Sequence, residues 1–198
     1  MAVDFRRIIR NLLDFYDFSS RNVLSIGAGG GQLLEYARSA KQVVAVDFDP
    51  AALQTLMDKA REAGLADRFE PVTSEFSSFS RRGDLVLFEF CLHEMPDVRS
   101  ALSHARTLAP DVLVMDHGPD SPWAFMVSEE EKVATVWSTL GTLPLRKKAL
   151  FETTQFFGSY DELFQKVSSQ GETSIARIEK FKGASQFTIP MVYGFALI

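Results

Sequence analysis

Glycines and a carboxylate stand at the ends of two apolar runs in the first third of the chain. The stretch 27–31 (GAGGG) directly follows the run 23–26, and Asp47 ends the run 43–46. Glycines at a strand-to-helix turn let the backbone reverse tightly and approach a ligand closely. A carboxylate at the end of the next strand can accept hydrogen bonds from both hydroxyl groups of a ribose. These features predict a site for a ribose-containing ligand.

Two pairs of titratable residues, His93-Glu94 and Asp116-His117, each follow a later apolar run. Because the carboxyl ends of parallel strands meet at one edge of a sheet, we expect both pairs to face the same crevice. Histidine titrates near neutral pH, so His93 and His117 are candidate catalytic bases, with Glu94 as a third candidate. These residue types also bind metals, but their spacing matches no strong metal motif, and we therefore expect no metal site.

The elements that must carry these residues alternate between strands and helices up to residue 117. Apolar runs predict strands at 23–26, 43–46, 69–73, 84–90 and 112–115. Apolar spacing and capping residues predict helices at 4–18, 32–40, 50–63 and 98–108. Asp49 and Asp97 are the expected N-caps of the last two helices. Such alternation implies right-handed crossovers and a parallel sheet that is buried on both faces.

Beyond residue 117 the pattern changes. We expect helices near 129–140, 145–152 and 160–169, so that 118–170 forms a helical insertion or lid. The last segment, 173–198, is expected to form an antiparallel hairpin, with strands at 174–182 and 187–198. With the first helix inside 1–19, the 198 residues are predicted to form a single α/β domain.

The glycine stretch does not fit two other nucleotide-binding patterns. The dinucleotide fingerprint Gly-x-Gly-x-x-Gly needs a further glycine, and Gln32 or Leu34 stands at that place. The Gly-Lys-Ser/Thr triplet of a phosphate-binding P-loop is also missing. A nicotinamide oxidoreductase and a glycine-rich turn without a ligand therefore stay as weaker alternatives.

The sequence resembles the class I S-adenosylmethionine (SAM)-dependent methyltransferases in three stretches: VLSIGAGGG at 23–31, VVAVDFDP at 43–50 and DLVLFEFCLHEMPD at 84–97. The closing hairpin also suits that family, whose sheet carries a reversed seventh strand. The resemblance implies a Rossmann-like three-layer sandwich with a mostly parallel seven-stranded sheet. It also implies SAM as the cofactor and S-adenosylhomocysteine (SAH) as the product.

The resemblance assigns cofactor contacts to particular residues. Those nearest the methionine part of SAM are Gly27, Ala28 and Gly29. Asp47 would hold the ribose hydroxyls and Phe48 would lie on the adenine. The contacts to the adenine edge fall on Ser74, Glu75 and Phe76, and Phe90 would line the cofactor through its backbone.

One position departs from the family pattern. The family commonly has an acid two residues before the first glycine, which helps to fix the amino group of the cofactor, and this chain has Ser25. A serine accepts a hydrogen bond but carries no charge. A protein that binds SAM without turnover is therefore an alternative to an enzyme.

The composition of the chain argues against two classes of partner. A protein that binds nucleic acid is expected to be basic, whereas this chain has a net charge of −5, so a nucleic acid partner is not expected. The single cysteine, Cys91, cannot form an internal disulfide, and no apolar run approaches the roughly 18 residues of a membrane span. We expect a cytoplasmic protein without a membrane partner, whose oligomeric state the sequence does not indicate.

The acceptor is expected to contact the segment 123–160, which is rich in large aromatic residues from Trp123 to Tyr160. Methyl transfer from a sulfonium is an in-line displacement, so the protein must mainly hold the acceptor against the methyl carbon. An apolar lid over the crevice favours a small, partly apolar molecule methylated on oxygen or nitrogen. An RNA or protein methyltransferase is the alternative within the same family.

Overall fold

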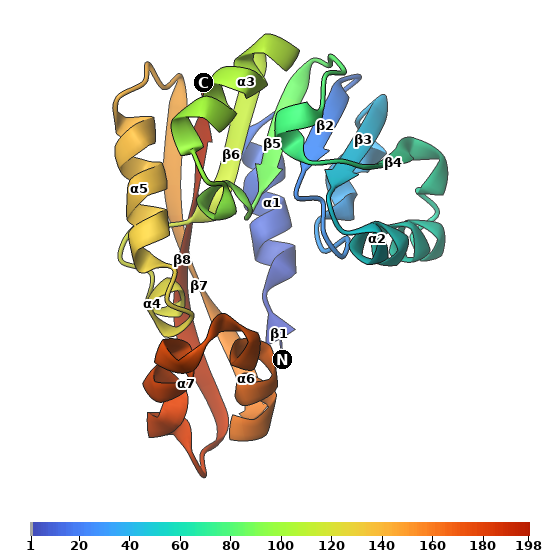
Figure 1. The fold of residues 1–198 in the computed structure, drawn as a ribbon. Helices are drawn as coiled ribbons and strands as arrows, with labels where there is room; N and C mark the ends of the chain where they lie inside the picture. The colour runs from blue at the N-terminus through green and yellow to red at the C-terminus, as the bar shows by residue number, and fades with distance from the viewer. Residues whose placement is uncertain (1) are drawn as a thin grey trace.

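A single sheet organises the molecule, and the computed structural model describes residues 2–198 of it (Figure 1). Its strands are β1 (Ala2–Val3), β2 (Asn22–Ile26), β3 (Gln42–Asp47), β4 (Phe69–Thr73), β5 (Leu85–Glu89), β6 (Asp111–His117), β7 (Lys147–Ser159) and β8 (Ser185–Leu197). They lie in the order β1-β7-β8-β6-β5-β2-β3-β4. Strands β2 to β6 are parallel, whereas β8 is antiparallel to β6 and β7. The order reverses at β2, between β3 and β5, which is where such sheets bind ligands.

Alternate residues of the parallel strands pack on opposite faces of the sheet. In β5, Leu85 and Leu87 share a core cluster with α1 (Phe5–Phe15) and α2 (Pro50–Glu62). Val86 and Phe88 share the other cluster with α3 (Val98–Leu108) and α5 (Glu130–Gly141). All four strand residues are completely buried. The predicted three-layer α/β sandwich is therefore confirmed, with the short β1 added at the edge beside β7.

The predicted helix starts at Asp49 and Asp97 are confirmed by their hydrogen bonds. The Asp49 side chain accepts from the Ala51 N–H at 2.9 Å, and the Asp97 side chain accepts from the Ser100 N–H at 3.0 Å. The predicted helix at 32–40 is instead a short 3₁₀ helix, η1 (Leu34–Arg38). It starts late because the glycine turn continues through Gly31, whose φ is +63°.

Short helices fill the remaining connections. They are the 3₁₀ turns η2 (Ala66–Arg68), η3 (Phe76–Ser78), η4 (Leu92–Glu94), η5 (Ser168–Gln170) and η6 (Glu179–Phe181), and the α-helices α4 (Pro122–Met126), α6 (Tyr160–Val167) and α7 (Glu172–Ile178). The predicted helices near 129–140 and 160–169 correspond to α5 and to α6 with η5. No helix in residues 2–198 has both the length and the apolar character needed to cross a membrane.

The C-terminal hairpin exists, but its first strand is not where the sequence predicted it. The expected strand at 174–182 is wrong, because this segment forms α7 and η6, with Ser174 and Ile178 buried at helical spacing. The expected helix at 145–152 is also wrong, since β7 runs from Lys147 to Ser159 and pairs along its length with β8. The segment 118–170 is therefore only partly helical.

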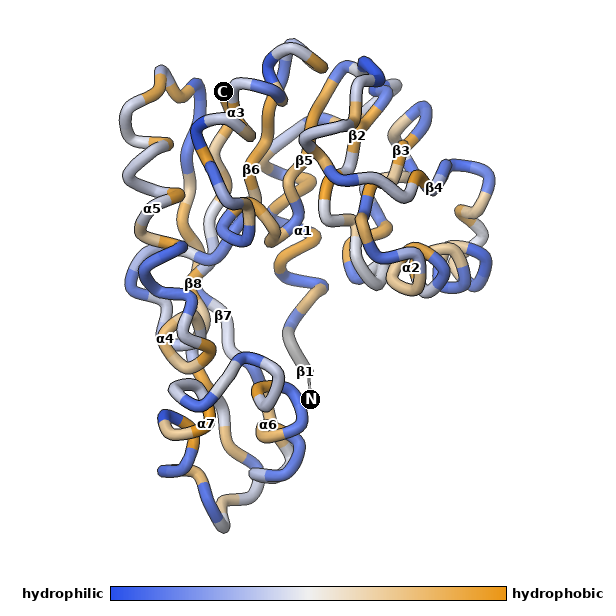
Figure 2. The backbone as a smooth tube through the Cα atoms, in the orientation of Figure 1, coloured by the Kyte–Doolittle hydropathy of each residue, from blue (hydrophilic) through white to orange (hydrophobic). Residues whose placement is uncertain are grey.

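The two long strands extend beyond the parallel part of the sheet. Only residues 193–197 of β8 pair with β6, while its earlier half pairs with β7 alone. Helices α6 and α7 cover this projecting half (Figure 1). Their buried residues Leu163, Val167 and Ile178 join the core cluster that also holds α1 and α2. Figure 2 shows the apolar residues concentrated along the strands of the sheet.

Candidate active site

The glycine stretch forms a turn that depends on left-handed backbone conformations. Gly27, Gly29 and Gly31 have φ values of +66°, +49° and +63°, which residues with a side chain rarely adopt. A Cβ atom on Gly27 would overlap the Cβ and Sγ atoms of Cys91. Glycine is therefore required at position 27 by packing as well as by conformation, because the loop lies directly against the end of β5.

Asp47 ties this loop to the end of β3. Its Oδ2 accepts a hydrogen bond from the Gly29 N–H at 3.0 Å, and its Oδ1 accepts from the Asp49 N–H at 3.0 Å. The side chain is buried, yet it lines the larger of two adjoining cavities at these strand ends. The next residue, Phe48, is 71% exposed, which leaves an aromatic face free at the edge of that cavity.

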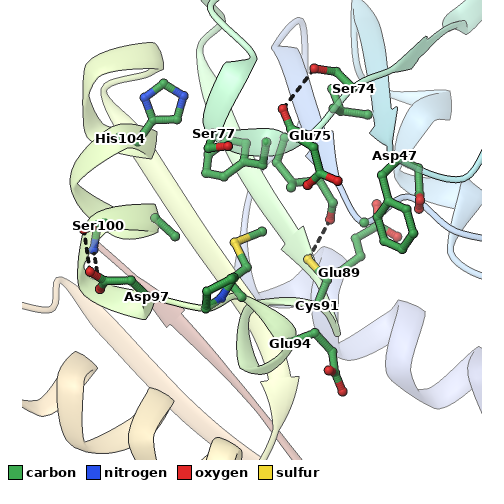
Figure 3. A pocket seen from close by; sticks show the side chains of 18 of the residues that line it. Asp47, Ser74, Glu75, Ser77, Glu89, Cys91, Glu94, Asp97, Ser100 and His104 are labelled. Atoms are coloured by element: carbon green, nitrogen blue, oxygen red, sulfur yellow. Dashed lines mark hydrogen bonds between the residues drawn. The ribbon is translucent and has the colours of Figure 1, made fainter.

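The larger cavity has a volume of about 670 Å³ and lies at the carboxyl ends of β2, β3 and β5. The predicted cofactor residues that line it are Gly27, Asp47, Phe48, Ser74, Glu75, Phe76 and Phe90. Figure 3 shows Asp97 and Ser100 on the wall opposite Asp47 and Ser74. Two further predicted residues lie elsewhere: Ala28 lines the smaller cavity, and Gly29 acts through its hydrogen bond to Asp47.

Glu89 is a site residue that the sequence reasoning missed. It ends β5 and borders both cavities. Its Oε1 accepts hydrogen bonds from the Ser25 hydroxyl at 2.5 Å and from the Tyr36 hydroxyl at 2.7 Å. Burial raises the pKa of Glu89 to about 7, although both hydrogen bonds oppose this increase. The sequence did contain a signal for Glu89. This acid ends an apolar run, and Ser25 stands where the family commonly has an acid of its own.

The smaller cavity, of about 270 Å³, adjoins the larger one. Gly27, Glu89 and Phe90 line both. Phe90 has a φ of +52°, a costly conformation for a residue with a side chain, and such strain is concentrated at functional sites. The remaining walls come from separated segments: Phe5, Ile8, Ala28, Gln32, Leu33, His117, Trp123, Gln155, Lys166 and Met191.

Two polar atoms beside this cavity have no partner. Among the described residues, His117 Nδ1 and Gln155 Oε1 are the buried side-chain nitrogen and oxygen atoms that lack a hydrogen bond. Both residues line the smaller cavity. Buried polar atoms without partners are costly, so this side of the cavity has unused hydrogen-bonding capacity.

The two predicted titratable pairs come together as expected, and a third segment joins them. His93 Nδ1 lies 2.5 Å from Asp116 Oδ1, and the His93 and His117 rings lie 5.4 Å apart. Glu129, at the start of α5, lies 3.4 Å from His93 Nε2 and 3.9 Å from His117 Nε2. The sequence reasoning missed Glu129, because nothing in its spacing links it to the strand ends.

The two histidines differ in their protonation. Burial lowers the pKa of His93, but hydrogen bonds to Asp116 and Glu129 outweigh this effect and raise it to about 10. Burial lowers the pKa of His117 below its usual value, since no hydrogen bond to its ring compensates. At neutral pH His117 is therefore the neutral imidazole, and unlike His93 it lines one of the two cavities.

Other predicted residues lie at different distances from the cavities. Glu94 is exposed, lines the larger cavity and pairs with Lys132 at 2.7 Å. Of the aromatic residues expected to cover the acceptor, Trp123 lines the smaller cavity. Phe157 is completely buried and stacks on Trp123, and Trp137 donates its Nε1–H to the His117 carbonyl. The other aromatic residues of the segment line neither of these two cavities.

Comparison with known proteins agrees with this geometry. A family model described as a methyltransferase domain matches residues 2–178. The chain belongs to this family, and the resemblance to SAM-dependent class I methyltransferases is confirmed.

Solved structures share the whole fold. A proposed methyltransferase from Bacillus halodurans C-125 superimposes with a TM-score of 0.68 at 16% identity, covering 98% of this chain and 97% of that chain. Magnesium protoporphyrin IX methyltransferase from Synechocystis PCC 6803, crystallised with SAM, gives a TM-score of 0.57 at 13% identity, covering 97% and 77%.

A curated relative is similar over part of its length. The ribosomal protein L11 methyltransferase of Salmonella arizonae is 26% identical over 133 residues, which is 66% of this chain and 43% of the relative. The chain therefore matches less than half of that protein.

Proposed function

We propose that this chain transfers the methyl group of SAM to an oxygen or nitrogen atom of a small, partly apolar molecule. The observation that carries this proposal is the pair of adjoining cavities at the switch point, which share Gly27, Glu89 and Phe90. The larger cavity, of about 670 Å³, is proposed to hold the nucleoside, with Asp47 as the acid that binds its ribose. The smaller lies next to it, where an acceptor has to be held.

The cofactor fits the larger cavity by the chemistry of its walls. Asp47 offers carboxylate lone pairs to the ribose hydroxyls, and the exposed ring of Phe48 offers a face to the adenine. The three residues Ser74, Glu75 and Phe76 line the same cavity, and in this proposal they contact the edge of the adenine. Glu89 supplies the negative charge that Ser25 lacks, and it is placed to pair with the amino group of the methionine part.

The acceptor fits the smaller cavity in size and character. Its walls are mostly apolar, with Phe5, Ile8 and Met191 among them, and its volume is about 270 Å³. Gln155 Oε1 has no partner within the chain, so it could accept a hydrogen bond from a donor on the acceptor. In the proposal His117 faces the acceptor as a neutral imidazole. His93 lies next to His117, with the ring centroids 5.4 Å apart, whereas Glu94 lines the larger cavity. These features favour a small molecule that carries a hydroxyl or amino group.

Binding and transfer should be measured separately. Isothermal titration with SAH tests the cofactor site. In Asp47→Asn we expect SAH affinity to fall by about 10- to 100-fold, corresponding to about 1–3 kcal/mol for a charge-assisted contact. Asp49→Asn is the matched control, because asparagine also caps helices. Equal affinities in Asp47→Asn and in the unaltered protein would refute the ribose contact.

Transfer is tested with methyl-labelled SAM and sets of hydroxy- and amino-aromatic compounds. Label in such a compound supports the proposal. Label only in ribosomal protein would favour a protein methyltransferase, as the likeness to the L11 enzyme suggests, and label in RNA would favour an RNA methyltransferase. Tight SAH binding without any transfer would indicate a binding protein.

A further inference from the structure

From the geometry of three buried side chains we infer that the chain holds a divalent transition-metal ion, ligated by His93, His117 and Glu129. One ring nitrogen of each histidine and one carboxylate oxygen of Glu129 all lie within 4.8 Å of one another. Ligand atoms about 2.1 Å from a tetrahedral ion lie roughly 3.4 Å apart. The separation of His93 Nε2 from Glu129 Oε2 is already 3.4 Å, and that of His117 Nε2 from the same oxygen is 3.9 Å. Rotation of the His117 side chain would therefore close the site.

A second layer of hydrogen bonds already orients the first of these ligands. Asp116, which is completely buried, accepts from the His93 ring at Nδ1 and also from the backbone N–H groups of His93 and His117. Histidines that bind metals almost always donate their other ring N–H to a carboxylate or carbonyl in this way. The arrangement fixes Nε2 as the atom of His93 that is turned toward Glu129.

Burial and charge also favour a cation here. His93, Glu129 and His117 are 6%, 7% and 9% exposed, and Asp116 is not exposed at all. Two buried carboxylates, Asp116 and Glu129, thus lie beside the two histidines. A dication that displaced the proton from His93 Nε2 would neutralise both carboxylates. Glu94 is a weaker candidate ligand, because it is exposed and paired with Lys132.

The donor set selects the kind of metal. Two imidazoles and one carboxylate form the ligand set of catalytic zinc sites with an open position, and also of two-histidine, one-carboxylate iron sites. Since His117 lines the smaller cavity, the open position would lie next to the acceptor. The metal site does not depend on the identity of that acceptor or on the turnover proposed above.

Zinc is the probe for the test. Full-length protein is stripped with a chelator, dialysed against Zn²⁺ and analysed for bound metal by mass spectrometry. We expect about one equivalent per chain, and less than about one-fifth of an equivalent in Glu129→Gln or His117→Asn. His104→Asn is the matched control, because the third histidine lies outside the cluster and bonds to the Phe79 carbonyl. Its metal content should equal that of the unaltered protein.

Two further measurements separate a specific site from adventitious binding. Asp116→Asn should weaken zinc binding by about 10- to 100-fold, the usual effect of removing a carboxylate behind a metal-binding histidine. Co²⁺ in place of Zn²⁺ should give visible d–d bands without a thiolate charge-transfer band, since Cys91 is not a ligand.

Circular dichroism checks that each variant is folded. SAH titration, measured alongside, keeps the test of the metal site separate from the test of methyl transfer. Folded protein that retains no stoichiometric zinc would overturn the site and leave an ordinary ion-pair cluster. Zinc retained in both ligand variants, or a thiolate band with Co²⁺, would overturn it as well.

Discussion

At the scale of single residues, the proposed cofactor site contains one buried carboxylate that accepts hydrogen bonds from two hydroxyl groups. Glu89 accepts hydrogen bonds from Ser25 and Tyr36, yet burial raises its pKa to about 7. The charged form of Glu89 is the form that pairs with an ammonium group. The affinity for a ligand that carries one must therefore depend on pH near neutrality.

We expect SAH affinity to rise by about tenfold between pH 5.5 and pH 7.0. Binding an ammonium favours the ionised acid, so affinity increases as pH rises toward the pKa of about 7 in the free protein. The α-amino group of SAH stays protonated across this range, because even the less basic α-amino group of a peptide has a pKa above about 7. Titration calorimetry at the two pH values measures the effect.

The matched variant is Glu89→Gln, which keeps the size of the side chain and removes the charge. Its affinity should be lower at pH 7.0 and should not change between the two pH values. A rise of the same size in this variant would show that another group titrates and that Glu89 does not contact the amino group.

A second prediction concerns the position of the acid, which this chain carries at Glu89 in β5 and which the family commonly has at the position of Ser25 in β2. Ser25→Asp should destabilise the protein by roughly 3 kcal/mol, since it places a carboxylate within hydrogen-bond distance of Glu89 in a buried position. The double variant Ser25→Asp, Glu89→Gln should recover most of this loss and bind SAH. Urea unfolding measures the stability of both. Equal stability of the single and double variants would contradict the proposed coupling.

At the scale of elements, the hairpin of β7 and β8 packs closely against α5, and α5 in turn contacts the site. Gly194 in β8 lies under α5, where a Cβ atom would come 2.5 Å from Leu150 and 2.6 Å from Trp137. Trp137 in turn donates a hydrogen bond to the carbonyl of His117. The position of α5 against the strand therefore affects the residues that line the smaller cavity.

Gly194→Ala should destabilise the protein by about 1–3 kcal/mol, because overpacking forces Trp137 or the strand to move. At this chain length the loss corresponds to a decrease in Tm of roughly 2–10 °C. Gly141→Ala is the control, since Gly141 ends α5 and a Cβ atom added there would have no atom within 4 Å. That variant should be neutral or stabilised by about 0.5–1 kcal/mol. A calorimetric scan that found the two variants alike would show that the contact is easily relieved.

The elements also show how far sequence alone leads. Strands β2 to β6 were predictable, because burial on both faces requires continuous apolar runs. The N-capping residues Asp49 and Asp97 likewise predicted the starts of α2 and α3. Strand β7 was not predictable, because its inward positions include Thr153 and Gln155, which break the apolar alternation. In the site, Asp47 and the histidines lie at predictable strand ends. Glu129 approaches from a distant segment, and only the tertiary packing of α5 brings it to them.

At the scale of the whole molecule, the two cavities join parts of the chain that are distant in sequence. Walls of the smaller cavity come from α1, the glycine loop, α4, α6 and both strands of the hairpin. Walls of the larger cavity come from the ends of β2, β3 and β5, from the segment that follows β4, and from η4 and α3. A ligand in the larger cavity is therefore bound only by the fully assembled fold.

A ligand that binds only the native state stabilises it in proportion to the logarithm of its concentration over Kd. SAH at a hundredfold excess over its Kd should contribute about 2.7 kcal/mol, which is a rise in Tm of roughly 5–10 °C for a chain of this size. NAD at the same concentration should leave Tm unchanged, because Gln32 stands where the dinucleotide fingerprint needs glycine. Differential scanning calorimetry compares the two ligands directly. Both ligands would bind in the same crevice at β2. A rise in Tm with NAD and none with SAH would therefore favour hydride transfer over methyl transfer.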